Sequence, residues 1–367
     1  MSKIRVLVID DAVVVRRIVT DVLTADPALE VVGTAANGKI GIAKISQVNP
    51  DVITLDVEMP EMDGLETLVA IRKSYPRIPI IMFSTLTARG AATTLDALSR
   101  GASDYVTKPA NVGGFAAAQQ SLREQLIPKI KALCGKAEIA PRAVSTPGVA
   151  TVRSATQSRT KSSVIDVVAI GVSTGGPNAL CDLLPAIPGD FPVPIVIVQH
   201  MPPMFTKLLA DRLDQQCQIG VREGTVDEPV LAGQAYVAPG DYHMVVKRQL
   251  TRTILSLQRE PPENSCRPAV DVLFRSVVDI YRSGTLGVIL TGMGQDGLRG
   301  CELIRDAGGQ VLAQDEGSSV VWGMPGFVAR AGLADQVLPL NQIAAEIVRR
   351  VRTGRVPAEV KRGAACS

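Results

Sequence analysis

The stretch VVAIGVSTGGP, residues 167–177, joins a short apolar run to a glycine-rich turn. The run Val167–Ile170 ends at a glycine, and Ser173 follows before two more glycines and a proline. Apolar residues then recur at helical spacing, so we predict a buried strand, a tight turn and a helix start. Ser173 would lie on that turn at the carboxyl edge of a sheet, where a nucleophile can meet a substrate.

The same alternation of apolar runs and helical spacing recurs along the chain and predicts an α/β protein. Such alternation builds open, mostly parallel sheets with helices on both faces. We therefore expect two doubly wound parallel-sheet domains, the first flavodoxin-like and the second Rossmann-like, with ligand sites beyond the carboxyl ends of the strands. The expected strands are Ile4–Ile9, Val52–Leu55, Ile80–Phe83, Tyr105–Val106, Val167–Ile170, Ile195–Val198, Tyr236–Ala238, Leu286–Leu290 and Val311–Ala313.

Composition places the domain boundaries. Residues 141–163 are rich in Ser, Thr, Ala and Pro and contain no acidic residue, which is typical of a flexible tether. We expect the last helix of the first domain to extend past residue 120, over the segment with Leu122, Leu126, Ile127 and Ile130. The expected division is a first domain at 1–125, a linker at 126–163, a second domain at 164–353 and a tail at 354–367.

The overall composition excludes several classes of protein. Only 3% of the residues are aromatic and the net charge is +3, which argues against nucleic-acid binding and a polybasic membrane anchor. The six cysteines show no CxxC pair or zinc-ligand spacing and suggest reduced thiols. No apolar run approaches the roughly 18 residues of a membrane span, and we expect no signal peptide and a cytoplasmic location.

Five polar residues follow strands of the first domain: Asp10, Asp11, Asp56, Ser84 and Lys108. Converging carboxylates repel one another, and a hard cation such as Mg²⁺ relieves that repulsion. A nearby lysine can hold an anionic phosphoryl oxygen. The set therefore suits phosphoryl transfer to an aspartate, although each acidic strand end taken singly could be a solvated turn.

Three strand ends of the second domain carry Ser173, His200 and Asp296. A serine hydroxyl needs a base within hydrogen-bond reach, and the base needs an orienting carboxylate. The chain has only two histidines, His200 and His243. We favour His200 because it directly follows a strand, as Ser173 nearly does, whereas His243 could be a loop residue or part of a lid.

Other interpretations of the Ser173 turn stay open. GVSTG matches the G-x-S-x-G motif, but the α/β-hydrolase order would need His243 with Asp227 or Asp241. STGGP could instead bind a phosphate at a helix start, although it fits neither G-x-G-x-x-G nor a GK[ST] motif. Ser173 could also be simply a helix N-cap.

Asp10-Asp11, Asp56 followed by MPEMDG, Ser84 and Lys108-Pro109 together resemble the receiver domain of bacterial response regulators. The resemblance implies that Asp56 accepts a phosphoryl group from a histidine kinase. It also implies that Asp10, Asp11 and Asp56 hold Mg²⁺ together with the backbone carbonyl of Glu58. Ser84 and Tyr105 would form the switch pair. Lys108 would sense the phosphate.

The second domain resembles, over nearly its full length, the catalytic domain of the chemotaxis protein-glutamate methylesterase family. The motifs are GVSTGGP, VIVQHMP, APGDYHM, CRPAVDVLFRS, VILTGMGQDG and AQDEGSSVVWGMP. The resemblance implies Ser173 as nucleophile, His200 as base, Asp296 as its orienting partner and the Met293 N–H as an oxyanion donor. It implies hydrolysis of glutamate methyl esters, and deamidation of selected glutamines, on the cytoplasmic domain of methyl-accepting chemoreceptors, with no cofactor in this domain.

The domain order suggests a means of control. We expect the first domain to cover the Ser173 cleft until phosphorylation of Asp56 shifts the population toward an open form. The alternative is a response regulator whose output domain only binds a receptor or DNA. The second domain is too large and too apolar for a helix-turn-helix module, which favours the enzyme.

Overall fold

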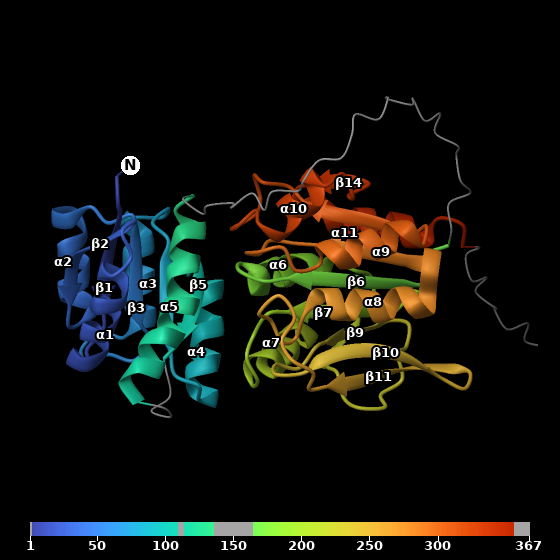
Figure 1. Ribbon diagram of the computed structural model, residues 1–367, viewed down its shortest axis with the longest axis horizontal. Helices are drawn as coiled ribbons and strands as arrows, with labels where there is room; N and C mark the ends of the chain where they lie inside the picture. The colour runs from blue at the N-terminus through green and yellow to red at the C-terminus, as the bar shows by residue number, and fades with distance from the viewer. Residues whose placement is uncertain (1, 109–113, 136–163, 356–367) are drawn as a thin grey trace, which may run out of the picture.

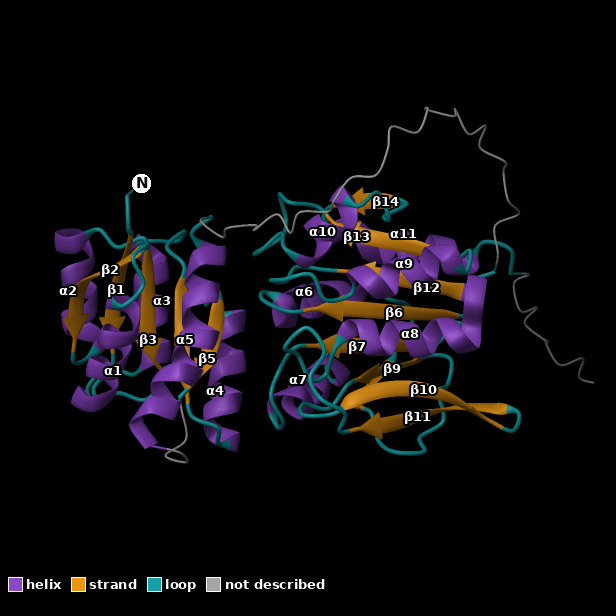
Figure 2. Ribbon diagram, viewed as in Figure 1, coloured by secondary structure: helices purple, strands orange, loops and turns teal. Residues whose placement is uncertain are grey.

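The computed structural model describes residues 2–108, 114–135 and 164–355. The expected linker from residue 136 onward, Pro109 and the tail from residue 356 lie outside the described residues. Two α/β units follow one another along the chain, each a parallel sheet between layers of helices (Figures 1 and 2). Among the described residues, no helix is both long enough and apolar enough to cross a membrane.

The first unit contains a five-stranded parallel sheet with the strand order β2-β1-β3-β4-β5. The sequence did not reveal β2, because this edge strand is only partly buried and has no continuous apolar run. The strands are β1 (Ile4–Ile9), β2 (Leu29–Ala35), β3 (Val52–Asp56), β4 (Ile80–Ser84) and β5 (Asp104–Thr107). Asp56 and Ser84 are therefore the last residues of adjacent strands, at the carboxyl edge.

Helices cover both faces of this sheet. The helix α5 continues to Leu133, so the first domain extends beyond the expected boundary at 125. The reason is packing, because Leu126, Ile127 and Ile130 are buried together with the core residues of β1 and α1. α1 (Val13–Thr24) and α5 (Gly114–Leu133) share one face, and α2 (Gly38–Val48), α3 (Gly64–Ser74) and α4 (Ala88–Ser99) share the other.

The second unit contains a seven-stranded sheet with the order β14-β13-β12-β6-β7-β9-β8 and only parallel pairs. The chain leaves β6 toward β7 on one side and later returns to β12 on the other. The carboxyl ends of β6 and β12 therefore flank a topological switch point, where open α/β sheets bind ligands. The strands are β6 (Val167–Val172), β7 (Ile195–Gln199), β8 (Gly220–Glu223), β9 (Gln234–Val237), β12 (Thr285–Ile289), β13 (Gln310–Gln314) and β14 (Gln336–Leu338).

The remaining elements of the second unit pack around this sheet. An antiparallel hairpin, β10 (His243–Gln249) and β11 (Arg252–Gln258), forms a separate two-stranded sheet. Two short 3₁₀ turns, η1 (Leu184–Ala186) and η2 (Arg282–Gly284), follow α6 and α8. α6 (Gly176–Leu183), α7 (Phe205–Asp214) and α11 (Leu340–Arg352) lie on one face, with α8 (Val270–Tyr281), α9 (Leu298–Asp306) and α10 (Met324–Arg330) on the other.

The two units contact each other at the carboxyl edge of the second sheet. Figure 1 shows α4, β5 and α5 on the side that faces α6 and α7. The ring of Tyr105 stacks on Phe205 with centroids 4.8 Å apart, and Asn178 Nδ2 donates to the Leu98 carbonyl at 2.8 Å. The first unit therefore lies against the end of the second sheet where Ser173 is located.

Candidate active site

Ser173 lies on the turn that links β6 to α6, and backbone contacts fix this turn. Ser173 N–H donates to the Thr291 carbonyl at 3.0 Å, which ties the turn to the loop after β12. Gly175 has a φ of +79°, a conformation that favours glycine. The N-cap of α6 is Gly175, so the interpretation of Ser173 as an N-cap is wrong and its side chain is left available.

His200 follows β7 directly and pairs with a buried carboxylate. Its Nε2 lies 2.8 Å from Asp296 Oδ2, and Asp296 is only 2% exposed. The carboxylate also accepts from the backbone N–H groups of Val270 at 2.6 Å and Asp271 at 3.1 Å. These donors hold Asp296 in one orientation, and Asp296 in turn fixes the plane of the imidazole.

The hydrogen bond between the two residues shifts both pKa values. Burial alone would raise the pKa of Asp296, but the His200 imidazole beside it and the backbone donors lower it below its ordinary value. Burial lowers the pKa of His200, but the bonds to Asp296 and to the Cys266 thiol outweigh it and raise this pKa to about 10. Both bonds favour the protonated imidazole, and that proton must be lost before His200 can act as a base.

The other nitrogen of His200 faces a thiol that sequence reasoning did not single out. Cys266 Sγ lies 3.6 Å from His200 Nδ1. Within the described residues, no hydrogen bond joins the Ser173 hydroxyl to the imidazole. The two residues are nevertheless close, because His200 N–H donates to the Val172 carbonyl at 3.2 Å, directly before Ser173. The structure thus pairs His200 with Asp296 and places Ser173 at the adjacent strand end.

Asn264 is a second site residue that the sequence did not reveal, and its side-chain amide contacts two carboxylates. Its Nδ2 donates to Asp296 Oδ1 and to Asp271 Oδ2, each at 2.9 Å. Asn264 and Cys266 belong to one tight turn in which Asn264 has a φ of 54° and Ser265 a φ of 63°. The only signal in the sequence was the motif CRPAVDVLFRS, which Cys266 begins and Asn264 precedes by two residues, and this motif carries no spacing rule for catalysis.

His243 has a structural place, so the expectation of a loop or lid residue is wrong. It begins β10 and is 1% exposed. Its Nε2 lies 3.1 Å from the Pro261 carbonyl, and its Nδ1 accepts from the Ala269 N–H at 3.2 Å. Asp241, one of the two acids that an α/β-hydrolase order could use, binds Arg259 and Arg267 instead. Both nitrogens of His243 are occupied by backbone groups.

Met293 lies in the loop between β12 and α9, which approaches the Ser173 turn closely. A Cβ at Gly292 would lie 2.8 Å from the Ser173 Cβ, so glycine permits this approach. The Gly292 N–H donates a hydrogen bond to the Val321 carbonyl at 3.0 Å. Among the described residues, the Met293 N–H has no such acceptor, which leaves it available as a donor.

The first unit gathers its acidic residues as the sequence predicts. Oxygens of Asp10, Asp11 and Asp56 lie within 4.8 Å of one another. Lys108 Nζ lies 2.7 Å from Asp56 Oδ2 and 3.3 Å from Asp10 Oδ2. Burial, and then the charge of Asp10, raise the pKa of Asp56 to about 6 against the effect of Lys108. Three crowded carboxylates, those of Asp10 and Asp56 buried, offer the oxygen ligands that a divalent cation prefers.

The expected switch residues lie on the neighbouring strands β4 and β5 and make different contacts. Ser84 is buried at the end of β4, where its hydroxyl accepts from Thr94 Oγ1 at 2.7 Å. Tyr105 instead stacks on Phe205 in the second unit. Glu58 N–H donates to Asp56 Oδ1 at 3.3 Å, and its side chain is exposed. Ser84 is thus close to Asp56, while Tyr105 is engaged at the contact between the units.

The first unit also contacts the nucleophile turn itself. Thr174, the residue after Ser173, donates from Oγ1 to Asp104 Oδ2 at 2.9 Å. Asp104 Oδ2 also pairs with Lys129 Nζ at 2.8 Å. A cavity of about 570 Å³ between the units is lined by His200 and Cys266 on one side and by residues of β5 and α5 on the other. The first unit thus borders the His200 side of the site.

Comparison with known proteins gives consistent matches. Residues 168–347 match the CheB methylesterase family, and residues 6–118 match the response regulator receiver domain. The chain is 54% identical to a protein-glutamate methylesterase/protein-glutamine glutaminase of Trichodesmium erythraeum, covering 96% of this chain and all of that relative. It is 50% identical to a protein of the same description from a Nocardioides species, covering 99% of this chain and all of that one. The solved catalytic domain of Thermotoga maritima CheB methylesterase superposes with a TM-score of 0.50 at 44% identity, covering 51% of this chain and 99% of that domain.

Proposed function

The chain belongs to the CheB methylesterase family, with a response regulator receiver domain in front, and from this we propose how its residues perform and control the reaction. It is a protein-glutamate methylesterase and protein-glutamine glutaminase of a chemotaxis two-component system. The alternative of an output domain that only binds is thereby set aside. The roles of single residues are proposals, and the pairing of His200 with Asp296 at 2.8 Å beside the Ser173 turn carries them.

Hydrolysis of the glutamate methyl ester proceeds through an acyl-enzyme. Neutral His200 takes the Ser173 proton through Nδ1, because Nε2 faces Asp296. The hydroxyl oxygen attacks the ester carbonyl, and the Met293 N–H donates to the resulting oxyanion. The tetrahedral intermediate collapses with loss of methanol, which receives the proton from His200. Water, deprotonated by His200, then attacks the glutamyl-serine ester and releases glutamate.

Deamidation of glutamine follows the same route with ammonia as the leaving group. An amide and an ester form the same kind of tetrahedral intermediate, so one oxyanion donor serves both. The protonated imidazole is the acid that the poorer leaving group requires. Its contact with the buried Asp296 carboxylate stabilises the imidazolium during that step.

The receiver domain accepts the phosphoryl group on Asp56. Mg²⁺ held by Asp10, Asp11 and Asp56, with a carbonyl of Glu58, would neutralise the phosphoryl oxygens during transfer. Lys108 already contacts the Asp56 carboxylate at 2.7 Å, so it is placed to bind the phosphoryl group. The donor is a histidine kinase of the same pathway, and the substrate is the cytoplasmic part of a methyl-accepting chemoreceptor. The enzyme therefore works in the cytoplasm.

Phosphorylation opens the site. In the structure the receiver domain binds Thr174 next to the nucleophile and stacks Tyr105 on Phe205. Phosphorylation of Asp56 replaces the single negative charge of its carboxylate by the about 1.5 to 2 negative charges of a phosphoryl group, and it adds three hydrogen-bond acceptors at this edge of the sheet. Ser84 and Lys108 would turn toward the phosphoryl group, Tyr105 would follow Ser84, and its stack on Phe205 would be lost. The population then shifts toward the open form.

A labelling experiment tests the triad. A serine-directed phosphonate should modify Ser173, and the Ser173→Ala variant should neither react nor demethylate receptors. The His200→Ala variant should retain almost no activity, whereas His243→Ala should affect folding more than the chemistry. Should His200→Ala remain active while His243→Ala is inactive and folded, the assignment of the base is wrong.

A further inference from the structure

The segment AQDEGSSVVWGMP, residues 313–325, has no role in the triad, yet it is fixed against the oxyanion loop. Gly292 and Trp322 pair as an isolated parallel bridge. The indole N–H of Trp322 donates to the Gln314 carbonyl at 3.0 Å. Trp322 is therefore held in a defined orientation next to Met293, the proposed oxyanion donor.

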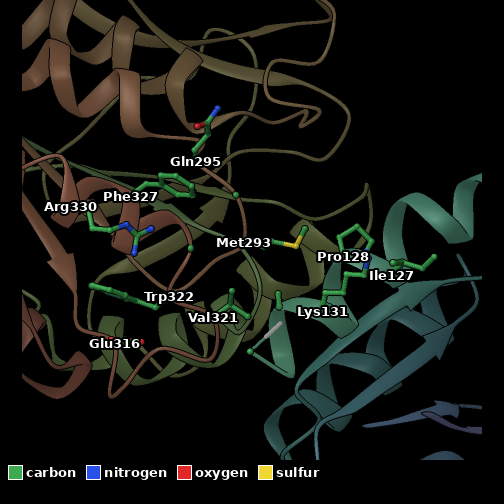
Figure 3. A pocket seen from close by; sticks show the side chains of 14 residues that line it. Ile127, Pro128, Lys131, Met293, Gln295, Glu316, Val321, Trp322, Phe327 and Arg330 are labelled. Atoms are coloured by element: carbon green, nitrogen blue, oxygen red, sulfur yellow. The ribbon is translucent and has the colours of Figure 1, made fainter. Parts of the chain in front are cut away.

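A pocket of about 670 Å³ opens between this segment and helix α5 (Figure 3). Its catalytic-domain side includes four apolar side chains, those of Met293, Val321, Trp322 and Phe327, with the polar Gln295 and Glu316 beside them. The guanidinium of Arg330 lies 5.3 Å from the ring centroid of Trp322 and 5.0 Å from that of Phe327. We call this wall, Met293, Val321, Trp322, Phe327 and Arg330 together, the aromatic wall.

Arg330 gives the aromatic wall a positive charge that nothing in the described part of the chain neutralises. Arg330 is exposed, and no ion pair among the described residues includes it. Glu316 also lines the pocket without pairing to it. A Cβ at Gly326 would lie 3.0 Å from both Arg330 and Trp322, so the glycine leaves room for the guanidinium over the ring. The wall therefore suits a partner with an apolar face and a carboxylate.

In the closed form a helix already faces the aromatic wall. The opposite side of the pocket is made by Ile127, Pro128, Lys131 and Ala132 of α5. Residues at this spacing lie on one face of a helix. Figure 3 shows this helix on the far side of Met293 from Trp322. One wall of the pocket thus belongs to the catalytic domain. The other wall is α5, which would move away when the receiver domain undocks.

We propose that the aromatic wall is the docking groove for the receptor helix that carries the methylated glutamate. The proposal rests on the function proposed above and adds the recognition of the substrate. The receptor helix takes the place of α5, lays its small and aliphatic side chains on Trp322 and Phe327, and pairs one of its carboxylates with Arg330. The receiver domain then inhibits by occupying the substrate's own groove as well as by covering Ser173.

Kinetics on the full chain, activated with a small phosphodonor, test this groove. Arg330→Ala should raise KM for methylated receptor by about 3- to 10-fold at nearly unchanged kcat, since the lost pair is partly solvated. Arg330→Glu should raise KM further, and Arg330→Lys should restore much of the affinity. Arg248→Ala, which removes an exposed arginine on the β10–β11 hairpin, is the matched control. The rate at which a small phosphonate labels Ser173 should be the same in all these variants, because that reagent does not need the groove.

The fluorescence of Trp322 gives a direct binding measurement, because it is the only tryptophan of the chain. In phosphodonor-treated Ser173→Ala protein, a glutamate-rich helical peptide with glutamine at the reacting position should change this emission in a saturable way. A lysine-rich helical peptide of equal length should not. Arg330→Ala should weaken the response to the acidic peptide by the same factor as KM.

The outcomes separate the groove from the proposed function. If KM for receptor and the peptide response stay at wild-type values in Arg330→Ala and Arg330→Glu while demethylation is normal, the groove is refuted and the methylesterase mechanism stands. If the wild-type chain fails both to demethylate receptors and to react with the phosphonate, the mechanism and the groove fail together.

Discussion

Replacing Asp104 by asparagine tests how strongly the receiver domain holds the nucleophile turn. Asp104 Oδ2 accepts a hydrogen bond from Thr174 across the domain contact at 2.9 Å. The ion pair between Asp104 and Lys129 lies within the receiver domain and is present in both the closed and the open form. Its loss therefore changes the free-energy difference between the two forms little. A hydrogen bond to a charged group contributes about 1.5–3 kcal/mol and a neutral one about 0.5–1.5 kcal/mol. The substitution should therefore destabilise the closed form by roughly 1–1.5 kcal/mol.

That loss corresponds to an increase in the open population of about 5- to 13-fold, at about 1.4 kcal/mol for each factor of ten. The assay is release of methanol from methylated receptor by the full chain without a phosphodonor. Basal activity should rise by that factor, while the maximum reached with a phosphodonor should not change. A basal rate within about twofold of wild type in a folded variant, a change of less than about 0.4 kcal/mol, would refute the reasoning, because the Thr174 bond would then contribute almost nothing to the closed form.

The matched control is Asp96→Asn. Asp96 pairs with Arg212 across the same contact at 3.1 Å, but its side chain is 53% exposed. Exposed ion pairs contribute about 0–1 kcal/mol, so basal activity should rise less than in Asp104→Asn. An equal rise in both variants would mean that overall charge, rather than the buried bond to Thr174, holds the closed form.

Three further predictions follow from the site. Asn264→Ala removes a donor from the Asp296 carboxylate and should lower kcat by about tenfold, a loss of about 1.4 kcal/mol, with KM nearly unchanged in steady-state kinetics; an increase in KM alone would contradict this positioning role. The Cys266 thiol helps to raise the pKa of His200 to about 10, and the base must be neutral, so basal activity should rise with pH and Cys266→Ala should move this rise to lower pH. A pH–rate profile that is identical in the two proteins would disprove that contribution. Burial and the charge of Asp10 raise the pKa of Asp56, which must be ionised to attack, so phosphorylation by a small phosphodonor should slow at acidic pH and Mg²⁺ should shift this loss to lower pH, whereas Asp56→Asn should show no activation at any pH.

Local pattern was sufficient to predict the elements that carry the reacting groups. The β-branched runs before Asp10, Asp56 and Ser173 can be buried only as central parallel strands, and their ends fix where the polar residues lie. The scarcity of histidine limited the base to two residues, and the strand end favoured His200. The edge strand β2 was missed because a half-buried strand has no continuous apolar run.

Contacts between distant segments were beyond the sequence. Asn264 and Cys266 lie far along the chain from Ser173, and only the folded turn brings them to Asp296 and His200. His243 could be identified as structural only once both of its nitrogens were seen to contact backbone groups. Such pairings depend on how helices and loops pack, which residue spacing does not encode.

The Ser173 turn shows which features of the site the sequence determines and which depend on tertiary structure. The apolar run, the glycines and the proline of residues 167–177 determined a strand, a turn and a helix, because each residue type restricts its own backbone. The access of a substrate to that turn was decided by tertiary structure, since Asp104 reaches Thr174 and α5 faces the aromatic wall from another domain. Backbone preference is local and can be predicted from sequence, whereas the contact between two surfaces requires both of them to be folded.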